Sequence, residues 1–145
     1  MRVYLAGPWV RRDEVRAARE HVRAAGFTVD CRWIDFDATQ HDENAEVVMS
    51  REALNDVEDI LESDALMVLN LEKSEGKAVE QGIAFSRGIP VVVVGPFSNV
   101  FQRLQGFARV DTLEEGLAVL KVKKAQARII RGIIRDELLG ERIGR

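Results

Sequence analysis

The sequence predicts an α/β protein of the doubly wound class, with a five-stranded parallel sheet, a C-terminal helix and a single domain over residues 1–145. Short apolar runs alternate with segments of helical periodicity, which is the pattern of a parallel sheet covered by helices on both faces. The run at 89–94 is apolar and largely β-branched, as expected for a strand buried on both sides. The chain shows no internal repeat, low-complexity tract or linker that would divide it.

Apolar runs bounded by turn residues predict the strands. They lie at residues 3–6, 27–33, 65–69, 89–94 and, as a short fifth strand, 107–110. Glycine and proline mark the ends of two of them, because Gly7 and Pro8 follow the first and Gly95 and Pro96 follow the fourth.

Segments with a helical period connect these strands. They lie at residues 12–25, 45–61, 78–87 and from 113 to about 139. Gly26 and Gly88 close the first and third helices, and Asp111 with Thr112 caps the last. Residues 34–44 are polar and irregular, which predicts a loop. Right-handed crossovers between the strands then give a Rossmann-like or flavodoxin-like domain.

Composition excludes several classes of protein. The net charge of −3 argues against a general nucleic-acid binder. Residues 121–145 hold eight Lys or Arg and three Asp or Glu, so this segment has a net charge of +5 and the rest of the chain −8. The favoured interpretation of this basic segment is a solvated helix face. Cys31 is the only cysteine, so no disulfide framework is expected, and no signal peptide or membrane-length apolar run is present. A cytoplasmic protein without a membrane partner is predicted.

Several common site motifs are absent from the sequence. No G-x-G-x-x-G follows the first strand and no G-x-x-x-x-G-K-[ST] occurs, so the usual dinucleotide site and a P-loop are not expected. No serine lies in a nucleophile elbow. His41, Asp42, Glu43 and Asn44 lack a partner cluster, which favours a solvated loop over a metal site. We expect neither a metal nor another cofactor.

The carboxyl ends of the predicted strands place the functional site. Ligands of open α/β folds bind at this rim of the sheet, where Trp9 follows the first strand and Trp33 ends the second. Residues 74–80 follow the third strand and residues 95–99 the fourth. Indoles, a phenyl ring and a few polar groups suit a flat heteroaromatic ligand with polar edges. Edge packing is the alternative role of the two tryptophans, and it weighs more for Trp33.

Glu80 is the candidate working residue because it lies one turn into the helix after a glycine turn. The helix dipole there favours an ionised carboxylate, and complementing that dipole is the alternative, purely structural role. An acid partner is expected on the helix at 45–61. Asp56 and Asp59 both remain candidates on geometry, and Asp64 is assigned to the turn into the next strand.

Four segments together resemble the nucleoside 2-deoxyribosyltransferase family, which includes the 2'-deoxynucleoside 5'-monophosphate N-glycosidases. They are VYLAGP at 3–8, the acidic segment at 56–64, the turn at 76–82 and GPFSNVF at 95–101. They occur in family order over most of the chain. Their combination is moderately specific, whereas each segment alone is a weak signal.

The resemblance implies roles for individual residues. Glu80 matches the nucleophile that attacks the anomeric carbon of deoxyribose, and Tyr4 matches a tyrosine that orients it. Asp56 matches the aspartate that assists departure of the base, which favours it over Asp59. Gly7 is expected to let the backbone approach the ligand. Asn99 resembles a residue that reaches the 5' end of the sugar, in the family often from a neighbouring subunit.

Two positions depart from the family pattern and leave the 5' group open. Lys77 replaces a small or apolar residue. Ser74 stands where base-exchanging transferases often carry aspartate, and so resembles the monophosphate hydrolases, but those often have serine and arginine where this chain has Pro8 and Val10. The groups expected around a 5'-phosphate, if one is bound, are Arg11, Arg12, Ser74, the Gly76 amide and Lys77.

The resemblance therefore implies an enzyme that cleaves the N-glycosidic bond of 2'-deoxynucleosides through a covalent intermediate and transfers deoxyribose to another base. The alternatives are a monophosphate N-glycosidase that transfers it to water and a non-catalytic nucleotide sensor. A homo-oligomer is expected, because the apolar positions of the last helix exceed one narrow stripe. They are Val122, Ile129, Ile130, Ile133, Ile134 and Leu138.

Overall fold

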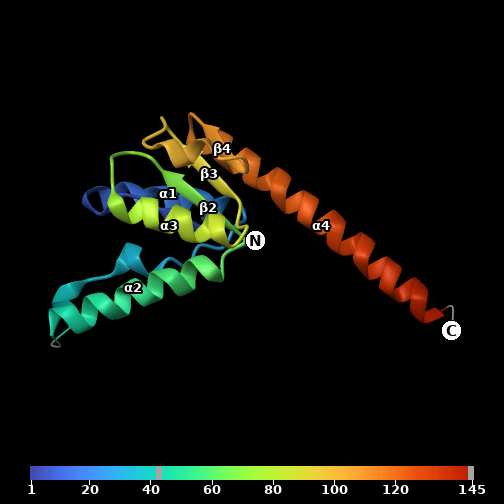
Figure 1. The fold of residues 1–145 in the computed structure, drawn as a ribbon, viewed down its shortest axis with the longest axis horizontal. Coiled ribbons are helices and arrows are strands. Elements are labelled where there is room, and N and C mark those ends of the chain that lie inside the picture. The colour runs from blue at the N-terminus through green and yellow to red at the C-terminus, as the bar shows by residue number, and fades with distance from the viewer. Residues whose placement is uncertain (42–43, 144–145) are drawn as a thin grey trace.

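A parallel four-stranded sheet forms the centre of the protein (Figure 1). The computed structural model describes residues 1–41 and 44–143, with side chains as far as residue 130. The strands follow one another in chain order across the sheet and are β1 (Val3–Ala6), β2 (Ala65–Leu69), β3 (Val91–Val94) and β4 (Phe107–Val110). Tyr4 pairs with Leu66, Leu66 with Val91, and Val91 with Phe107, which confirms the parallel arrangement.

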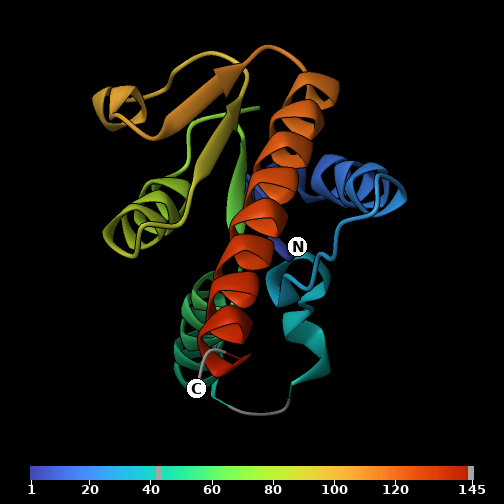
Figure 2. The ribbon, with the colours of Figure 1, turned by 90° about the vertical axis from the view of Figure 1, so that its right-hand side faces the viewer.

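Helices cover both faces of this sheet, as the doubly wound class requires. They are α1 (Arg12–Ala24), α2 (Ala45–Leu61), α3 (Glu75–Ser86) and α4 (Leu113–Ile143). Figure 2 shows α1 and α3 on opposite sides of the strands. The first turns of α4 pack on the sheet, where a Cβ on Gly116 would lie 3.0 Å from Met67. Lys124 on α4 donates a hydrogen bond to the Gly26 carbonyl, which places this part of α4 beside the end of α1.

The strand predicted at 27–33 does not form, so the prediction of five strands was wrong. This segment makes a single parallel bridge, between Arg2 and Thr28, and then turns into a short 3-10 helix, η2 (Arg32–Asp35). Side chains replace the missing ladder, because the Leu5 N–H donates to the Cys31 Sγ at 3.1 Å and the Leu5 carbonyl accepts from the Trp33 Nε1 at 3.0 Å. The edge of β1 is thereby satisfied without another strand.

The chain reverses its direction of travel across the sheet at β1. From β1 it passes through α1 to the Thr28 bridge on one side, and then returns through α2 to β2 on the other side. Such a reversal opens a crevice at the carboxyl ends of the two strands, which is where open α/β folds bind their ligands. The loops that follow β1 and β2 therefore define the place to look for a site.

Several element boundaries differ from the sequence prediction for local reasons. α3 begins at Glu75, three residues early, because the Ser74 side chain accepts from the Lys77 N–H and caps the helix. β3 begins at Val91, after Pro90, which has no N–H to donate. The predicted loop at 34–44 includes part of η2 and a second 3-10 helix, η3 (Ala38–Gln40).

The long C-terminal helix α4 runs from the sheet to the C-terminal end of the chain and extends well beyond the strands (Figure 1). Its exposed apolar side chains include Val122, Ile129 and Ile130. The side chains of Ile133, Ile134 and Leu138 lie outside the described part, as do Asp42 and Glu43. Among the described residues, no helix combines the length and the apolar content that a membrane crossing requires.

Candidate active site

A pocket of about 240 Å³ opens at the carboxyl ends of β1 and β2. The loop after β1, the 3-10 helix η2, one face of α2 and the start of α3 together form its wall. Its lining residues are Gly7, Trp9, Trp33, Phe36, Met49, Glu52, Ala53, Asp56, Ser74, Gly76, Lys77 and Glu80. The site is therefore the crevice that the reversal at β1 predicts.

Two carboxyl groups, those of Asp56 and Glu80, line this pocket, and a buried tyrosine interacts with both of them. Tyr4 is fully buried in the middle of β1, and its hydroxyl donates a 2.7 Å hydrogen bond to the Glu80 Oε1. Asp56 lies in the second half of α2 and interacts with the same hydroxyl. The Glu80 Oε2 and the Asp56 Oδ1 are buried, and neither has a hydrogen-bond partner among the described residues. A buried acceptor without a partner is costly, so these atoms are suited to a ligand.

Burial governs the protonation of this cluster. Desolvation, helped by the nearby charge of Asp56, raises the pKa of Glu80 to about 7, against the opposing effect of the Tyr4 hydrogen bond. Burial and the charge of Asp59 raise the pKa of Asp56 to about 6. The pKa of Tyr4 is raised by burial and by Glu80, so its hydroxyl stays protonated and donates. Desolvation of the Glu80 carboxyl group thus opposes the effect of the helix dipole, which favours the ionised form.

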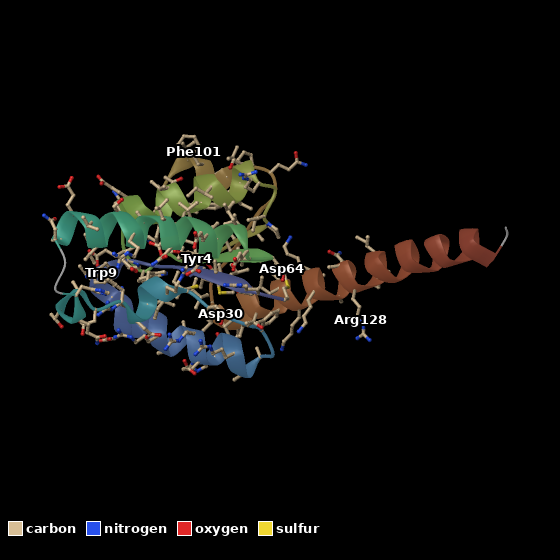
Figure 3. All side chains as sticks on the ribbon, turned by 90° about the horizontal axis from the view of Figure 1, so that it is seen from below. Tyr4, Trp9, Asp30, Asp64, Phe101 and Arg128 are labelled. Carbon is tan, nitrogen blue, oxygen red and sulfur yellow. The ribbon has the colours of Figure 1, made fainter. Side chains whose placement is uncertain are left out.

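The structure separates the acidic candidates on α2. Asp59 is buried away from the pocket, where it accepts hydrogen bonds from the Arg32 N–H at 2.9 Å and the Arg32 Nε at 3.0 Å. Asp64 accepts from the Arg2 N–H at 2.7 Å, which confirms its assignment to the turn before β2. Figure 3 shows Asp64 and Trp9 on opposite sides of Tyr4. Of these three acids, Asp56 alone lines the pocket.

Aromatic rings form one wall of the pocket. Trp9 is 54% exposed, and its ring centroid lies 6.4 Å from that of Trp33 and 6.2 Å from that of Phe36. The His41 ring stacks on Phe36 at 5.6 Å. The two ring pairs that include Trp9 are tilted, and the cluster offers an apolar surface to a flat ligand. Both tryptophans line the pocket, although Trp33 does so from η2 and not from the end of the predicted strand.

Sequence reasoning missed four of the lining residues. Phe36 lies just beyond η2, in a segment predicted as a loop, and Met49, Glu52 and Ala53 lie on α2. A signal was present in the helical spacing, because Met49, Ala53 and Asp56 recur at intervals of four and three residues and so share one helix face. The direction of that face required the tertiary structure.

The two predicted arginines do not line the pocket. Arg11 pairs with Glu14 through two contacts and donates to the Leu71 carbonyl. Arg12 donates to the Phe36 carbonyl and lies 4.2 Å from the ring centroid of Trp9, outside the pocket lining. The prediction that these two arginines assemble a phosphate site is not supported by their positions.

Lys77 contributes to the wall, but its ammonium group has partners elsewhere. Its Nζ donates to the Asn70 Oδ1 at 2.9 Å and to the Glu72 carbonyl, and burial lowers its pKa. Asn70 in turn donates to Gln102, and Gln102 donates to Gln81. This buried polar network joins the start of α3 to the loop after β3, so Lys77 stabilises the site rather than offering a free charge to it.

The remaining predicted residues divide between the pocket and its surroundings. Ser74 and Gly76 line the pocket at the start of α3. Gly7 lines it too, and a Cβ there would lie 2.5 Å from Val15, so packing of α1 already requires glycine. Pro8 is buried outside the pocket. Asn99 does not line the pocket and instead caps the 3-10 helix η4 (Val100–Arg103), where its Oδ1 accepts from the N–H groups of Phe101 and Gln102.

The fold and this pocket define a doubly wound α/β protein with a half-buried pair of carboxyl groups beside an aromatic wall. The sequence profile of the nucleoside 2-deoxyribosyltransferase family matches residues 3–126, and the chain belongs to this family. Members of the family are N-glycosyl transferases and hydrolases that bind nucleosides or nucleotides. The resemblance stated from the sequence is thereby confirmed.

Solved structures of low sequence identity share the fold. A 2-deoxyribosyltransferase from Bacillus psychrosaccharolyticus is 21% identical, with a TM-score of 0.64 over 79% of this chain and 89% of its own. A conserved protein from Enterococcus faecalis V583 is 19% identical, with a TM-score of 0.63 over 85% and 98%. The CMP N-glycosidase BcmB from Clostridium botulinum is 16% identical, with a TM-score of 0.55 over 85% and 99%. A comparison with curated protein sequences gave no match.

Proposed function

We propose that the protein cleaves the N-glycosidic bond of 2'-deoxynucleosides and transfers the deoxyribose to another base. The observation that carries this proposal is the pair of carboxyl groups in the pocket, each with one buried oxygen that lacks a partner among the described residues. Tyr4 holds the Glu80 Oε1, which leaves the Oε2 of the same carboxylate free to react. A nucleotide sensor that only binds its ligand needs no such pair.

The chemistry follows that of a retaining glycosidase. The ionised Glu80 attacks the anomeric carbon through Oε2 while the bond from that carbon to the base nitrogen breaks, and protonated Asp56 gives its proton to the departing base. The result is a glycosyl ester on Glu80. A second base then attacks the same carbon, the ester bond breaks to restore the carboxylate, and Asp56 accepts the proton that the incoming base loses.

The distribution of charge favours a free nucleoside over its 5'-monophosphate. Arg11 is paired with Glu14, Arg12 lies outside the pocket, and the Lys77 ammonium is held by Asn70. The groups at the start of α3 that remain in the pocket, Ser74 and the Gly76 backbone, suit a 5'-hydroxyl. A monophosphate would lack a charged partner from the described side chains that line the pocket, apart from Lys77.

We therefore expect kcat/KM for a 2'-deoxynucleoside to exceed that for its 5'-monophosphate, measured as base release with and without an acceptor base. The Arg11→Ala variant is expected to leave this preference unchanged, and Ser74→Ala to lower kcat/KM for the nucleoside several-fold by removing one hydrogen bond. A monophosphate preference that falls in both variants and with added salt would instead identify a monophosphate N-glycosidase. Absence of base release from every deoxynucleoside and monophosphate would favour the sensor.

A homo-oligomer completes the proposal. An apolar groove of about 370 Å³ lies between α3 and η4, and it contains Asn99. Phe85, Phe101 and Leu104 line it and are exposed. Adjoining apolar side chains of this kind mark interaction surfaces more often than free surface. We infer that a second copy of the chain covers this groove, which would bring Asn99 close to a neighbouring subunit.

Light scattering at micromolar concentration is expected to give at least a dimer, and Phe101→Asp is expected to give monomers with reduced turnover. Phe101 is 68% exposed, so the substitution leaves the core of each subunit intact. Val122→Asp on α4 is the matched control, because Val122 is 58% exposed and far from the groove in sequence. A fully active wild-type monomer would contradict the proposal, and dissociation by Val122→Asp alone would move the interface to α4.

A further inference from the structure

Glu52 holds a place in the pocket that the mechanism above does not use. It lies on α2 four residues before Asp56, so both carboxyl groups occupy one face of the helix and both line the pocket. Glu52 is half-buried. Because Asp56 is assigned to the sugar and its leaving nitrogen, Glu52 lies one helical turn away from the reacting bond, toward the start of α2, on the side where Figure 3 shows Trp9.

The position of this carboxylate is set by a chain of hydrogen bonds. The Asn55 Nδ2 donates to the Glu52 Oε1 at 2.9 Å, and the Asn55 Oδ1 accepts from the Arg32 Nη1 at 2.9 Å. Arg32 is itself fixed by the buried carboxylate of Asp59 at 3.0 Å. A side chain with a fixed partner keeps one geometry, which is a requirement for selecting among similar ligands.

The surroundings of Glu52 define which ligand group it can bind. The rings of Trp9, Trp33 and Phe36 offer a face to a flat base but no acceptor within the plane of that base. A carboxylate accepts hydrogen bonds and does not donate them. The edge of the base that reaches Glu52 must therefore present an N–H donor, such as an exocyclic amino group.

We propose that Glu52 selects bases that carry an exocyclic amino group, as adenine does, over analogues without one. The proposal rests on the proposed function, since it assumes that the base lies along α2. Removal of the Glu52 carboxylate loses one hydrogen bond to the amino group. The expected effect is a loss of about 10-fold in discrimination, because one charged hydrogen bond contributes about that much.

Two substrates that differ only in the amino group test the proposal. They are 2'-deoxyadenosine and purine 2'-deoxyriboside, assayed for kcat/KM with the same acceptor base in the wild type, Glu52→Ala and Glu46→Ala. For each protein we take the ratio of kcat/KM for 2'-deoxyadenosine to kcat/KM for purine 2'-deoxyriboside, so that an effect of the substitution on both substrates cancels. The two bases also differ as leaving groups, and comparing each variant's ratio with that of the wild type removes this difference. We expect the ratio to fall about 10-fold in Glu52→Ala and to stay constant in Glu46→Ala, an exposed position in the first turn of α2.

A third variant and a binding measurement complete the test. Glu52→Gln supplies an amide that can donate, so it is expected to shift preference toward 2'-deoxyinosine, whose 6-oxo group accepts. Calorimetric Kd values for free adenine and free purine are expected to show the same loss of discrimination in Glu52→Ala without any turnover. An unchanged ratio in both assays would overturn the role of Glu52 while base release still supports the proposed function. A changed binding ratio without base release would instead leave Glu52 as a base-binding residue and reject the transferase.

Discussion

Replacement of Glu80 by glutamine is expected to abolish turnover while the protein still folds and binds a nucleoside. The glutamine amide oxygen can accept a hydrogen bond from the Tyr4 hydroxyl, as the Glu80 Oε1 does at 2.7 Å. It does not form the glycosyl ester, because an amide oxygen is a poor nucleophile. We expect kcat to fall by at least about 10³-fold, as for the loss of other covalent nucleophiles, measured as base release from 2'-deoxynucleosides.

The matched control is Glu75→Gln, which makes the same change on the same helix at an exposed position outside the pocket. It is expected to leave kcat unchanged. Near wild-type turnover in Glu80→Gln would reject the covalent mechanism. Glu80→Ala is a less decisive variant, because an added small nucleophile can occupy the space that the side chain leaves.

Thermal stability provides an independent check that Glu80→Gln has not simply unfolded. The pKa of Glu80 is raised from 4.5 to about 7, so the folded protein binds this proton more tightly than the unfolded chain. The resulting stabilisation is present at low pH and is lost as the pH rises through about 7, an effect of about 3 kcal/mol. Glutamine carries no charge at any of these pH values. We therefore expect Glu80→Gln to have a higher Tm than the wild type at about pH 8 and a similar Tm at about pH 5.

Replacement of Asp56 by asparagine is expected to slow natural substrates by about 10²-fold or more and to slow substrates with activated bases much less. The reason is that an activated base leaves without a proton from Asp56, whereas an ordinary base needs general acid catalysis. The comparison of kcat/KM for the two kinds of leaving base measures this difference. An equal loss for both would mean that Asp56 positions the substrate instead of protonating it.

The pH dependence of the same variant tests the proton assignment. The pKa values are about 6 for Asp56 and about 7 for Glu80, so the singly protonated pair is most populated between these values and holds its proton mainly on Glu80. The reactive form is the minor tautomer of this pair, in which Asp56 carries the proton and Glu80 is ionised. The wild-type kcat/KM is expected to be bell-shaped, with its maximum in that range. Asp56→Asn removes the descending limb at high pH, and it lowers the pKa of Glu80 because the Asp56 charge that raises it is gone.

Asp59→Asn is the comparison variant for Asp56→Asn. Asp59 is bound to Arg32 by two hydrogen bonds and is buried, so we expect a loss of stability of about 3 kcal/mol or more rather than selectivity for the leaving base. A selective loss in Asp59→Asn and none in Asp56→Asn would show that Asp59 is the acid and that the assignment to Asp56 is wrong by one helical turn.

The sequence alone determined the class of fold, the family and the identity of the central residues. A central parallel strand can be predicted from its local sequence, because an apolar β-branched run such as 91–94 must be buried on both faces. The order of Tyr4, Asp56 and Glu80 along the chain, each beside a recognisable segment, was enough for the family resemblance that the profile match confirms. Their roles stay predictions until the variants are measured.

The tertiary structure decided what depends on contacts between distant residues. In place of the predicted strand at 27–33, the side chains of Cys31 and Trp33 form hydrogen bonds to the Leu5 backbone. Asp59 pairs with Arg32 and does not line the pocket. The tertiary structure also turned Glu52 into the pocket and directed the Lys77 ammonium to Asn70. The raised pKa of Glu80 has the same origin, because desolvation depends on which atoms surround a carboxyl group. A local sequence pattern specifies an element and its faces, whereas the partners of each side chain are fixed only when those faces pack together.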